Sequence, residues 1–222
     1  MTPASPEPRL DRILIVRLGS LGDIVHGLPA LAALRAAYPA SRIDWLVDRR
    51  NVELLRLVPG VDRLVVLERP TLAGWLAVIR ELRQTTYDAA LDLQGLLKSA
   101  VLARASGARR VLGFSIWHLR ERTARPFYSE TADPQGTTHV IQKNLALVAR
   151  LGAESGTLRF PLEHGQSPAL EAVRGWGEAW SARFALIKRA SHMAPFSAIE
   201  TFREIVTTFI RTGTLPREVW EP

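Results

Sequence analysis

The chain has 222 residues, 47% hydrophobic and 23% charged, a composition typical of a globular protein with one large or two small domains. It contains no cysteine, which excludes a disulfide framework, a thiolate metal site and a thiol nucleophile. The net charge of +7 is nearly all arginine and is scattered along the chain. Such a balance suits contact with carboxylates, phosphates or anionic lipid, and there is no aromatic-and-basic platform for nucleic acid.

The N-terminal residues 1–11 are polar and Pro-rich, so we expect a disordered lead-in. They lack the apolar core of a signal peptide, and no apolar run reaches the about 20 residues needed to span a bilayer. We therefore expect a cytoplasmic protein, with peripheral contact to the inner membrane.

Strand and helix patterns alternate along most of the chain. Short apolar runs predict strands at 13–16, 42–48, 63–67, 88–92 and 110–113. Amphipathic or Ala/Leu-rich runs predict helices at 28–38, 51–58, 72–84, 96–105 and 139–151. Alternation with short links is typical of an α/β fold, a Rossmann-like, doubly wound parallel sheet. Pro29 lies either in the first turn of its helix or at a kink in a helix that begins at Asp23.

The remaining segments are less regular. We expect an irregular stretch at 114–136 and a short edge strand at 158–162. Residues 167–180 and 198–211 have helical patterns, and 184–187 reads as the first strand of a second domain.

A turn at 19–22 follows the first strand, and Asp23 stands where a helix begins. Glycines permit a sharp turn, and helix-start amides offer unpaired donors to a ligand. In an open α/β sheet such a turn lies at the ligand-binding edge. Asp23 alone has two interpretations: it caps the helix, or it faces a ligand.

The stretch Arg17-Leu-Gly-Ser-Leu-Gly-Asp-Ile-Val-His-Gly-Leu-Pro-Ala-Leu31 resembles the N-terminal signature of the lipopolysaccharide heptosyltransferases, glycosyltransferase family 9, and of their heptosyltransferase I branch. The resemblance implies the N-terminal, acceptor-binding half of a GT-B glycosyltransferase. It also implies that Asp23 is the general base, and that Arg17, Ser20 and Gly22 help to bind the acceptor. A helix N-terminus keeps Asp23 ionised, which makes it a weak base unless proton transfer accompanies attack.

A second segment, Tyr87-Asp-Ala-Ala-Leu-Asp-Leu-Gln-Gly-Leu-Leu-Lys-Ser-Ala100, resembles the family segment that faces the acceptor. Strand-end geometry places Gln94 and Gly95 beside the Asp23 turn, and Lys98 follows one helical turn later. The resemblance implies that Gln94 and Lys98 contact the acceptor. The alternatives are a Gln94 that caps its own turn and a solvated Lys98.

A third segment, at 118–128, resembles the family's Arg-Glu run before a Phe-Tyr pair, in which the arginine holds the acceptor's carboxylate. Residue by residue that arginine is Arg120, and a guanidinium fork suits a carboxylate. The segment departs from the family pattern after Glu121, and Arg122 competes in register. His139 also matches a family position, where we expect a structural histidine.

Other features bear on the cofactors and the acceptor. The histidines are scattered and no Asp-x-Asp is placed to hold a diphosphate, so no metal and no cofactor are expected. Arg69 is the one basic residue kept where heptosyltransferase I members carry several that meet acceptor phosphates.

The family resemblance ends near residue 187, which predicts an acceptor domain at 12–182 and a remnant or divergent start of the donor domain at 183–222. The implied reaction is inverting, metal-independent transfer of heptose from ADP-heptose to a 3-deoxy-octulosonic acid residue on a lipid A–sugar acceptor. We expect a truncated enzyme that is weak or inactive alone. The alternative is a non-catalytic sugar-binding module or a degraded gene product.

Overall fold

The computed structural model describes residues 10–134, 136, 139–154 and 156–162. The predicted lead-in up to residue 9, the patterns at 167–180, 184–187 and 198–211, and the domain boundary at 182 lie outside these residues. Within them a six-stranded parallel sheet has the order β3-β2-β1-β4-β5-β6. The predicted α/β, Rossmann-like, doubly wound fold is confirmed.

The strands β1 to β5 match the apolar runs in the sequence. They are β1 (Arg12–Val16), β2 (Arg42–Asp48), β3 (Arg63–Leu67), β4 (Ala89–Asp92) and β5 (Arg110–Phe114). The inner strands are buried on both faces, which is why each reads as an almost unbroken apolar run rather than an alternating one.

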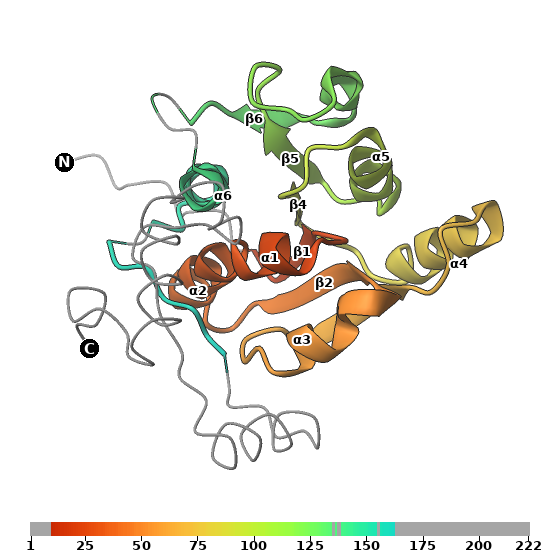
Figure 1. Ribbon diagram of the computed structural model, residues 1–222, viewed down its shortest axis with the longest axis horizontal. Coiled ribbons are helices and arrows are strands. Elements are labelled where there is room, and N and C mark those ends of the chain that lie inside the picture. The colour runs from red at the N-terminus through yellow and green to blue at the C-terminus, as the bar shows by residue number, and fades with distance from the viewer. Residues whose placement is uncertain (1–9, 135, 137–138, 155, 163–222) are drawn as a thin grey trace, which may run out of the picture. The chain divides into compact units, whose positions relative to one another are not determined.

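Helices cover both faces of the sheet (Figure 1). They are α1 (Leu21–Val25), α2 (Leu28–Ala37), α3 (Val52–Arg56), α4 (Leu72–Leu82), α5 (Leu97–Ala105) and α6 (Val140–Ala149). One core joins Ile13, Ile15 and Trp45 to apolar side chains of α1, α2, α3 and α6, and the other joins Leu14 and Val16 to those of α4 and α5. Alternate residues of each strand therefore serve opposite layers.

Pro29 lies in the first turn of α2, which begins at Leu28 after a separate short helix, α1. A missing N–H is harmless in a first helical turn, so the kinked alternative is wrong. Asp23 therefore lies on α1, a short helix that is separate from α2.

Two expectations for the less regular segments are wrong. The stretch at 114–136 contains a 3-10 helix, η2 (Arg122–Phe127), and a short edge strand, β6 (Glu130–Ala132), which pairs with β5. A strand of three residues is too short to show an apolar pattern in the sequence. An ion pair between Arg110 and Glu130, at 2.6 Å, joins β6 to β5. Residues 158–162 form no strand.

Candidate functional site

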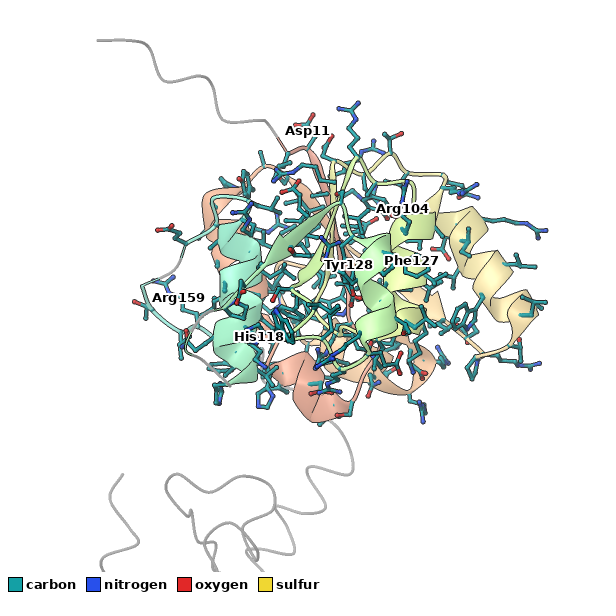
Figure 2. The ribbon with its side chains drawn as sticks, turned by 90° about the horizontal axis from the view of Figure 1, so that it is seen from above. Asp11, Arg104, His118, Phe127, Tyr128 and Arg159 are labelled. Carbon is teal, nitrogen blue, oxygen red and sulfur yellow. The ribbon has the colours of Figure 1, made fainter. Side chains whose placement is uncertain are left out.

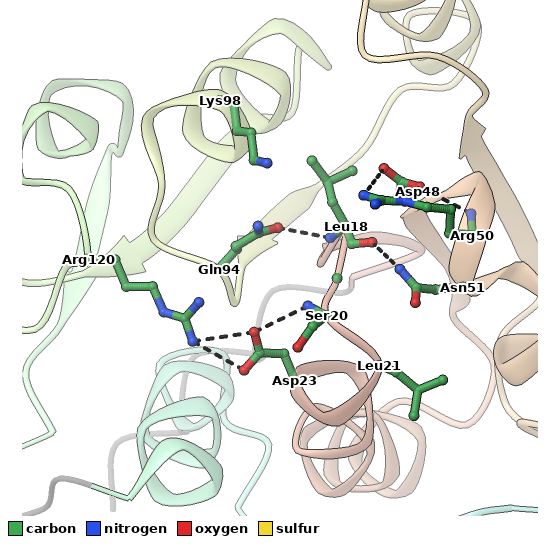
Figure 3. A pocket seen from close by; sticks show the side chains of 11 residues that line it. Leu18, Ser20, Leu21, Asp23, Asp48, Arg50, Asn51, Gln94, Lys98 and Arg120 are labelled. Carbon is green, nitrogen blue, oxygen red and sulfur yellow. Dashed lines mark hydrogen bonds and ion pairs between the residues drawn. The ribbon is translucent and has the colours of Figure 1, made fainter.

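The strand order reverses between β1 and β4, since β1 continues toward β2 while β4 leads to β5. In open α/β sheets ligands bind beyond the carboxyl ends of the strands at this point. A pocket of about 430 Å³ opens there. Its lining residues are Leu18, Gly19, Ser20, Leu21, Asp23, Asp48, Arg50, Asn51, Gln94, Lys98 and Arg120 (Figure 3).

The turns after β1 and β4 are fastened to each other by hydrogen bonds. The Leu18 amide donates to Gln94 Oε1 at 2.9 Å, and the Arg17 guanidinium donates to the Leu93 carbonyl. The expectation that Gln94 lies beside the Asp23 turn is therefore confirmed. Gln94 is buried, and its side-chain oxygen bonds the neighbouring turn rather than its own.

Asp92, at the end of β4, holds the second turn in place. It is fully buried and accepts hydrogen bonds from the Gln94 and Gly95 amides, from Ser99 Oγ and from the Tyr128 hydroxyl, at 2.8, 3.2, 2.8 and 2.7 Å. Gly95 has φ +69°, a left-handed conformation in which a side chain would be strained. Tyr128, whose hydroxyl donates to Asp92, is itself buried, with 4% of the residue exposed (Figure 2).

Asp23 is the third residue of α1 and projects into the pocket (Figure 3). Its Oδ1 lies 2.8 Å from Arg17 Nη2 and 3.1 Å from Arg120 Nη2. Its Oδ2 accepts from the Ser20 amide at 3.2 Å and from Arg120 Nη2 at 3.3 Å. Asp23 thus satisfies one helix-start amide and also lines the pocket, so its capping contact leaves it accessible to a ligand.

The surroundings of Asp23 keep it ionised. Burial raises the pKa of Asp23, but Arg17, Arg120 and the hydrogen bond from the Ser20 amide outweigh that effect, and the pKa lies below its ordinary value. Burial is also the main cause of the lowered pKa of Arg17, which Asp23 partly offsets.

Arg120 and Arg122, the two candidates in the third segment for binding the acceptor's carboxylate, lie in different surroundings. Arg120 reaches into the pocket and contacts Asp23, whereas Arg122 is exposed and lies over the Trp117 ring at 5.4 Å. Lys98 is exposed on the first turn of α5 and points its ammonium group into the pocket (Figure 3).

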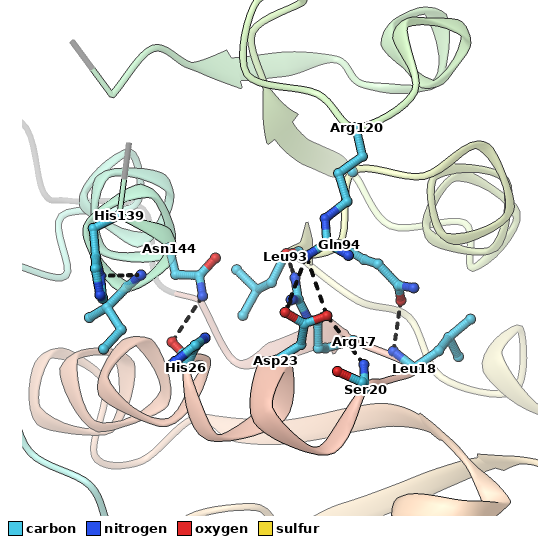
Figure 4. A network of polar contacts seen from close by, with 12 residues as sticks. Arg17, Leu18, Ser20, Asp23, His26, Leu93, Gln94, Arg120, His139 and Asn144 are labelled. Atoms are coloured by element: carbon cyan, nitrogen blue, oxygen red, sulfur yellow. Dashed lines mark hydrogen bonds and ion pairs between the residues drawn. The ribbon is translucent and has the colours of Figure 1, made fainter. Parts of the chain in front are cut away.

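Not every predicted contact residue lines the pocket. Ser20 does, but Gly22 is exposed beside it, and Arg17 is 1% exposed beneath it. His139 is the N-cap residue of α6 and accepts from the Ile141 amide through Nδ1 at 3.3 Å, as expected for a structural histidine (Figure 4). Among the described residues, no group of three or more metal-binding side chains gathers, and no helix has the length and apolarity to cross a membrane.

Sequence reasoning missed one wall of the pocket, formed by Asp48, the last residue of β2, and by Arg50 and Asn51, which follow it. Asp48 accepts from Arg50 Nε at 2.9 Å, and Asn51 Nδ2 donates to the Leu18 carbonyl at 3.0 Å. The signal was present, because β2 neighbours β1 and its carboxyl end must open on the same edge of the sheet.

This chain is similar to known proteins in sequence and in fold. Residues 75–174 match the model of glycosyltransferase family 9 (heptosyltransferase). Lipopolysaccharide heptosyltransferase 1 of Pseudomonas aeruginosa is 34% identical over 149 residues, 63% of this chain and 42% of that protein. The corresponding Escherichia coli K12 protein is 31% identical over 151 residues, 63% of this chain and 47% of that protein.

Solved structures agree with these matches. The E. coli heptosyltransferase WaaC with ADP superimposes with a TM-score of 0.59 and 28% identity, covering 67% of this chain and 49% of that one. A family 9 glycosyltransferase from Veillonella parvula shares the fold, with a TM-score of 0.64 and 21% identity over 78% of this chain. This chain spans less than half the length of the curated relatives it matches. The resemblance to glycosyltransferase family 9, and to heptosyltransferase I within it, is thereby confirmed.

Proposed function

We propose that this chain carries the acceptor-binding side of a glycosyltransferase that adds heptose to the inner core of lipopolysaccharide. The observation that carries the proposal is a carboxylate, Asp23, in a pocket shared by the turns after β1 and β4. Two cationic side chains, Lys98 and Arg120, line the same pocket. The relatives at 31–34% identity named lipopolysaccharide heptosyltransferase 1 supply the reaction class.

The proposed acceptor group is the hydroxyl of a 3-deoxy-octulosonic acid residue, whose carboxylate suits the basic lining. Arg120 offers a planar guanidinium that can bind a carboxylate through two parallel hydrogen bonds. Lys98 offers a second cation from α5, and the buried Gln94 offers its side-chain amide group. We assign Ser20 to the same acceptor surface, and place the protein at the cytoplasmic face of the inner membrane, where such a lipid-linked sugar would be met.

In the proposed reaction the acceptor hydroxyl oxygen attacks the anomeric carbon of ADP-heptose. The bond from that carbon to the diphosphate oxygen breaks, ADP departs, and the hydroxyl proton passes to Asp23. A carboxylate with a lowered pKa is a poor base toward a free hydroxyl, but it can accept the proton as the hydroxyl loses electron density in the transition state. Inversion follows from attack on the face opposite the leaving group.

The test is binding of a lipid A precursor that carries 3-deoxy-octulosonic acid, measured by calorimetry on the whole chain. We expect saturable binding that Arg120→Gln weakens at least tenfold and that Arg122→Gln leaves unchanged. Absence of saturable binding, or equal losses in both variants, would contradict the proposal.

A second measurement follows product formation with ADP-heptose present. Transfer that Asp23→Asn abolishes supports the base role. Binding without transfer identifies a sugar-binding module instead, and transfer that survives Asp23→Asn removes Asp23 from the mechanism.

A further inference from the structure

Both oxygens of Asp23 have cationic or amide partners. Oδ1 faces Arg17 Nη2 and Arg120 Nη2, and Oδ2 faces the Ser20 amide and the same Arg120 nitrogen (Figure 4). A carboxylate has about four lone-pair positions for hydrogen-bond donors. Arg17 Nη2 forms an ion pair with Oδ1 but no hydrogen bond, so the hydrogen bonds to Asp23 come from the Ser20 amide and from Arg120 Nη2. Arg120 contacts both oxygens, and a substrate hydroxyl that is to donate its proton to Asp23 competes with Arg120 for them.

Arg17 is held too firmly to be displaced. Its side chain is 2% exposed, it donates to the Leu93 carbonyl, and its own carbonyl accepts from Trp45 Nε1 at 3.1 Å. Removing it from Asp23 would leave a buried guanidinium without its counter-ion, which is strongly unfavourable. The Ser20 amide is likewise fixed, because it belongs to the backbone of the same turn.

Arg120 differs from Arg17 in exposure and in geometry. Half of its side chain is exposed, and it approaches from the segment after β5, 97 residues along the chain from Asp23. A single nitrogen, Nη2, serves both carboxylate oxygens, at 3.1 and 3.3 Å. Two contacts from one nitrogen are a weaker arrangement than two parallel bonds from a guanidinium edge, and exposed ion pairs contribute little.

We infer that Arg120 is an exchangeable partner of Asp23, which an incoming acceptor carboxylate draws away, while Arg17 is the permanent positioning residue. This inference rests on the proposed function, because it takes an anionic sugar as the ligand. The exchange frees one acceptor position on each oxygen of Asp23 at the moment when the sugar arrives. Arg120 thus occupies Asp23 while the site is empty, and binding of the acceptor makes Asp23 available to accept a proton.

The exchange changes the charge around Asp23 in a measurable way. Within the described part of the chain, the charged groups that act on Asp23 are Arg17, directly after β1, and Arg120, while the Ser20 amide acts from its own turn. Loss of a cation that lies 3.1 Å from the carboxylate raises the pKa of Asp23, because one of the charges that favour its ionised form is removed. Arg17 remains, so Asp23 stays ionised at neutral pH and gains basicity.

The experiment is a pH titration of the Asp23 carboxyl carbon by NMR on the whole chain, with the resonance assigned by its loss in Asp23→Asn. The probe is the methyl glycoside of 3-deoxy-octulosonic acid, and its methyl ester, which lacks the charge, is the matched control. We expect the acid to raise the pKa of Asp23 to the value found in Arg120→Gln without ligand. The ester should leave it unchanged, and Arg122→Gln should behave as the parent chain does.

The outcomes separate this inference from the proposed function. No binding of the acid overturns both. Binding of the acid with an unchanged or lowered pKa of Asp23 means that Arg120 bridges both carboxylates, which overturns only the exchange. An unchanged pKa in Arg120→Gln also overturns it, without any ligand, because Arg120 then exerts no hold on Asp23.

Discussion

The ring of Tyr128 occupies the space in which a side chain at Gly113 would stand. A Cβ at Gly113 would lie 2.4 Å from the Tyr128 ring, and that ring carries the hydroxyl that donates to Asp92 at 2.7 Å. A glycine on β5 therefore lets a tyrosine reach the carboxylate that fixes the turn after β4. Through Gln94, this packing extends to the pocket.

We expect Gly113→Ala to destabilise the fold by about 2–4 kcal/mol, since it combines overpacking with loss of a buried hydrogen bond. Urea unfolding followed by circular dichroism measures this loss. Gly22→Ala is the matched control, because no atom of the described residues lies within 4 Å of its Cβ position and its φ is not positive. Equal stability of the two variants would mean that Tyr128 moves aside at no cost.

Asp92 should make the protein less stable as the pH rises, whereas most carboxylates in folded proteins do the opposite. Burial raises its pKa, and the hydrogen bonds from Tyr128, Gln94, Ser99 and Gly95 lower it only in part. The folded state therefore binds more protons than the unfolded state above about pH 4, so the contribution of Asp92 to stability falls as pH rises from there. The stability difference between the parent chain and Asp92→Asn should shrink from pH 4 to pH 8 in urea titrations. A difference independent of pH would contradict this account.

The ion pair between Arg17 and Asp23 should dominate the cost of mutating either residue. Asp23→Asn leaves a guanidinium that is 2% exposed without its counter-ion, which costs about 3–5 kcal/mol. Adding Arg17→Met should recover part of that loss, because the double variant buries no unpaired charge. A double-mutant cycle by thermal unfolding measures the coupling, and additive losses would show that the two side chains act separately.

The pH dependence of this pair has the opposite sign to that of Asp92. The pKa of Asp23 lies below its ordinary value, so its stabilising contribution is complete above about pH 4 and is lost as pH falls through the folded-state pKa. Comparison of the parent chain with Asp23→Asn between pH 2 and pH 6 checks this. If the difference in stability between the parent chain and Asp23→Asn shrinks as the pH rises, the ion pair is not its source.

The sequence predicts most of this sheet because its strands are buried on both faces. Continuous apolar runs such as Ile13 to Val16 are typical of strands buried on both faces, and charged residues, Arg12 and Arg17, bound this one. The edge strand β6 escaped prediction because Glu130 and Thr131 carry no apolar pattern. Its place depends on pairing with β5, which is a tertiary contact.

The site was predicted only in part. Asp23, Gln94 and Lys98 follow strands that strand-end geometry brings together, and the pocket contains all three. Arg120 was assigned by resemblance, since a side chain 97 residues from its partner cannot be placed by local patterns. The residue types of Asp48 and Arg50 carry no such signal, because charged residues at the end of a strand more often face solvent than a ligand.

Lys98 offers a test of the electrostatic contribution to acceptor binding. Its exposed ammonium group contributes charge rather than a buried hydrogen bond, so Lys98→Gln should weaken binding of a 3-deoxy-octulosonic acid ligand by roughly three- to tenfold. The loss should shrink at high salt, because exposed charges are screened within about 10 Å at 0.1 M. Arg104→Gln is the matched control, an exposed cation in the last turn of the same helix, α5, and outside the pocket lining. If both variants lose affinity equally, the net charge of the chain attracts the ligand. A loss confined to Lys98→Gln means that the ligand binds within reach of the first turn of α5, in the pocket that Asp23 also lines, as an acceptor positioned for attack requires.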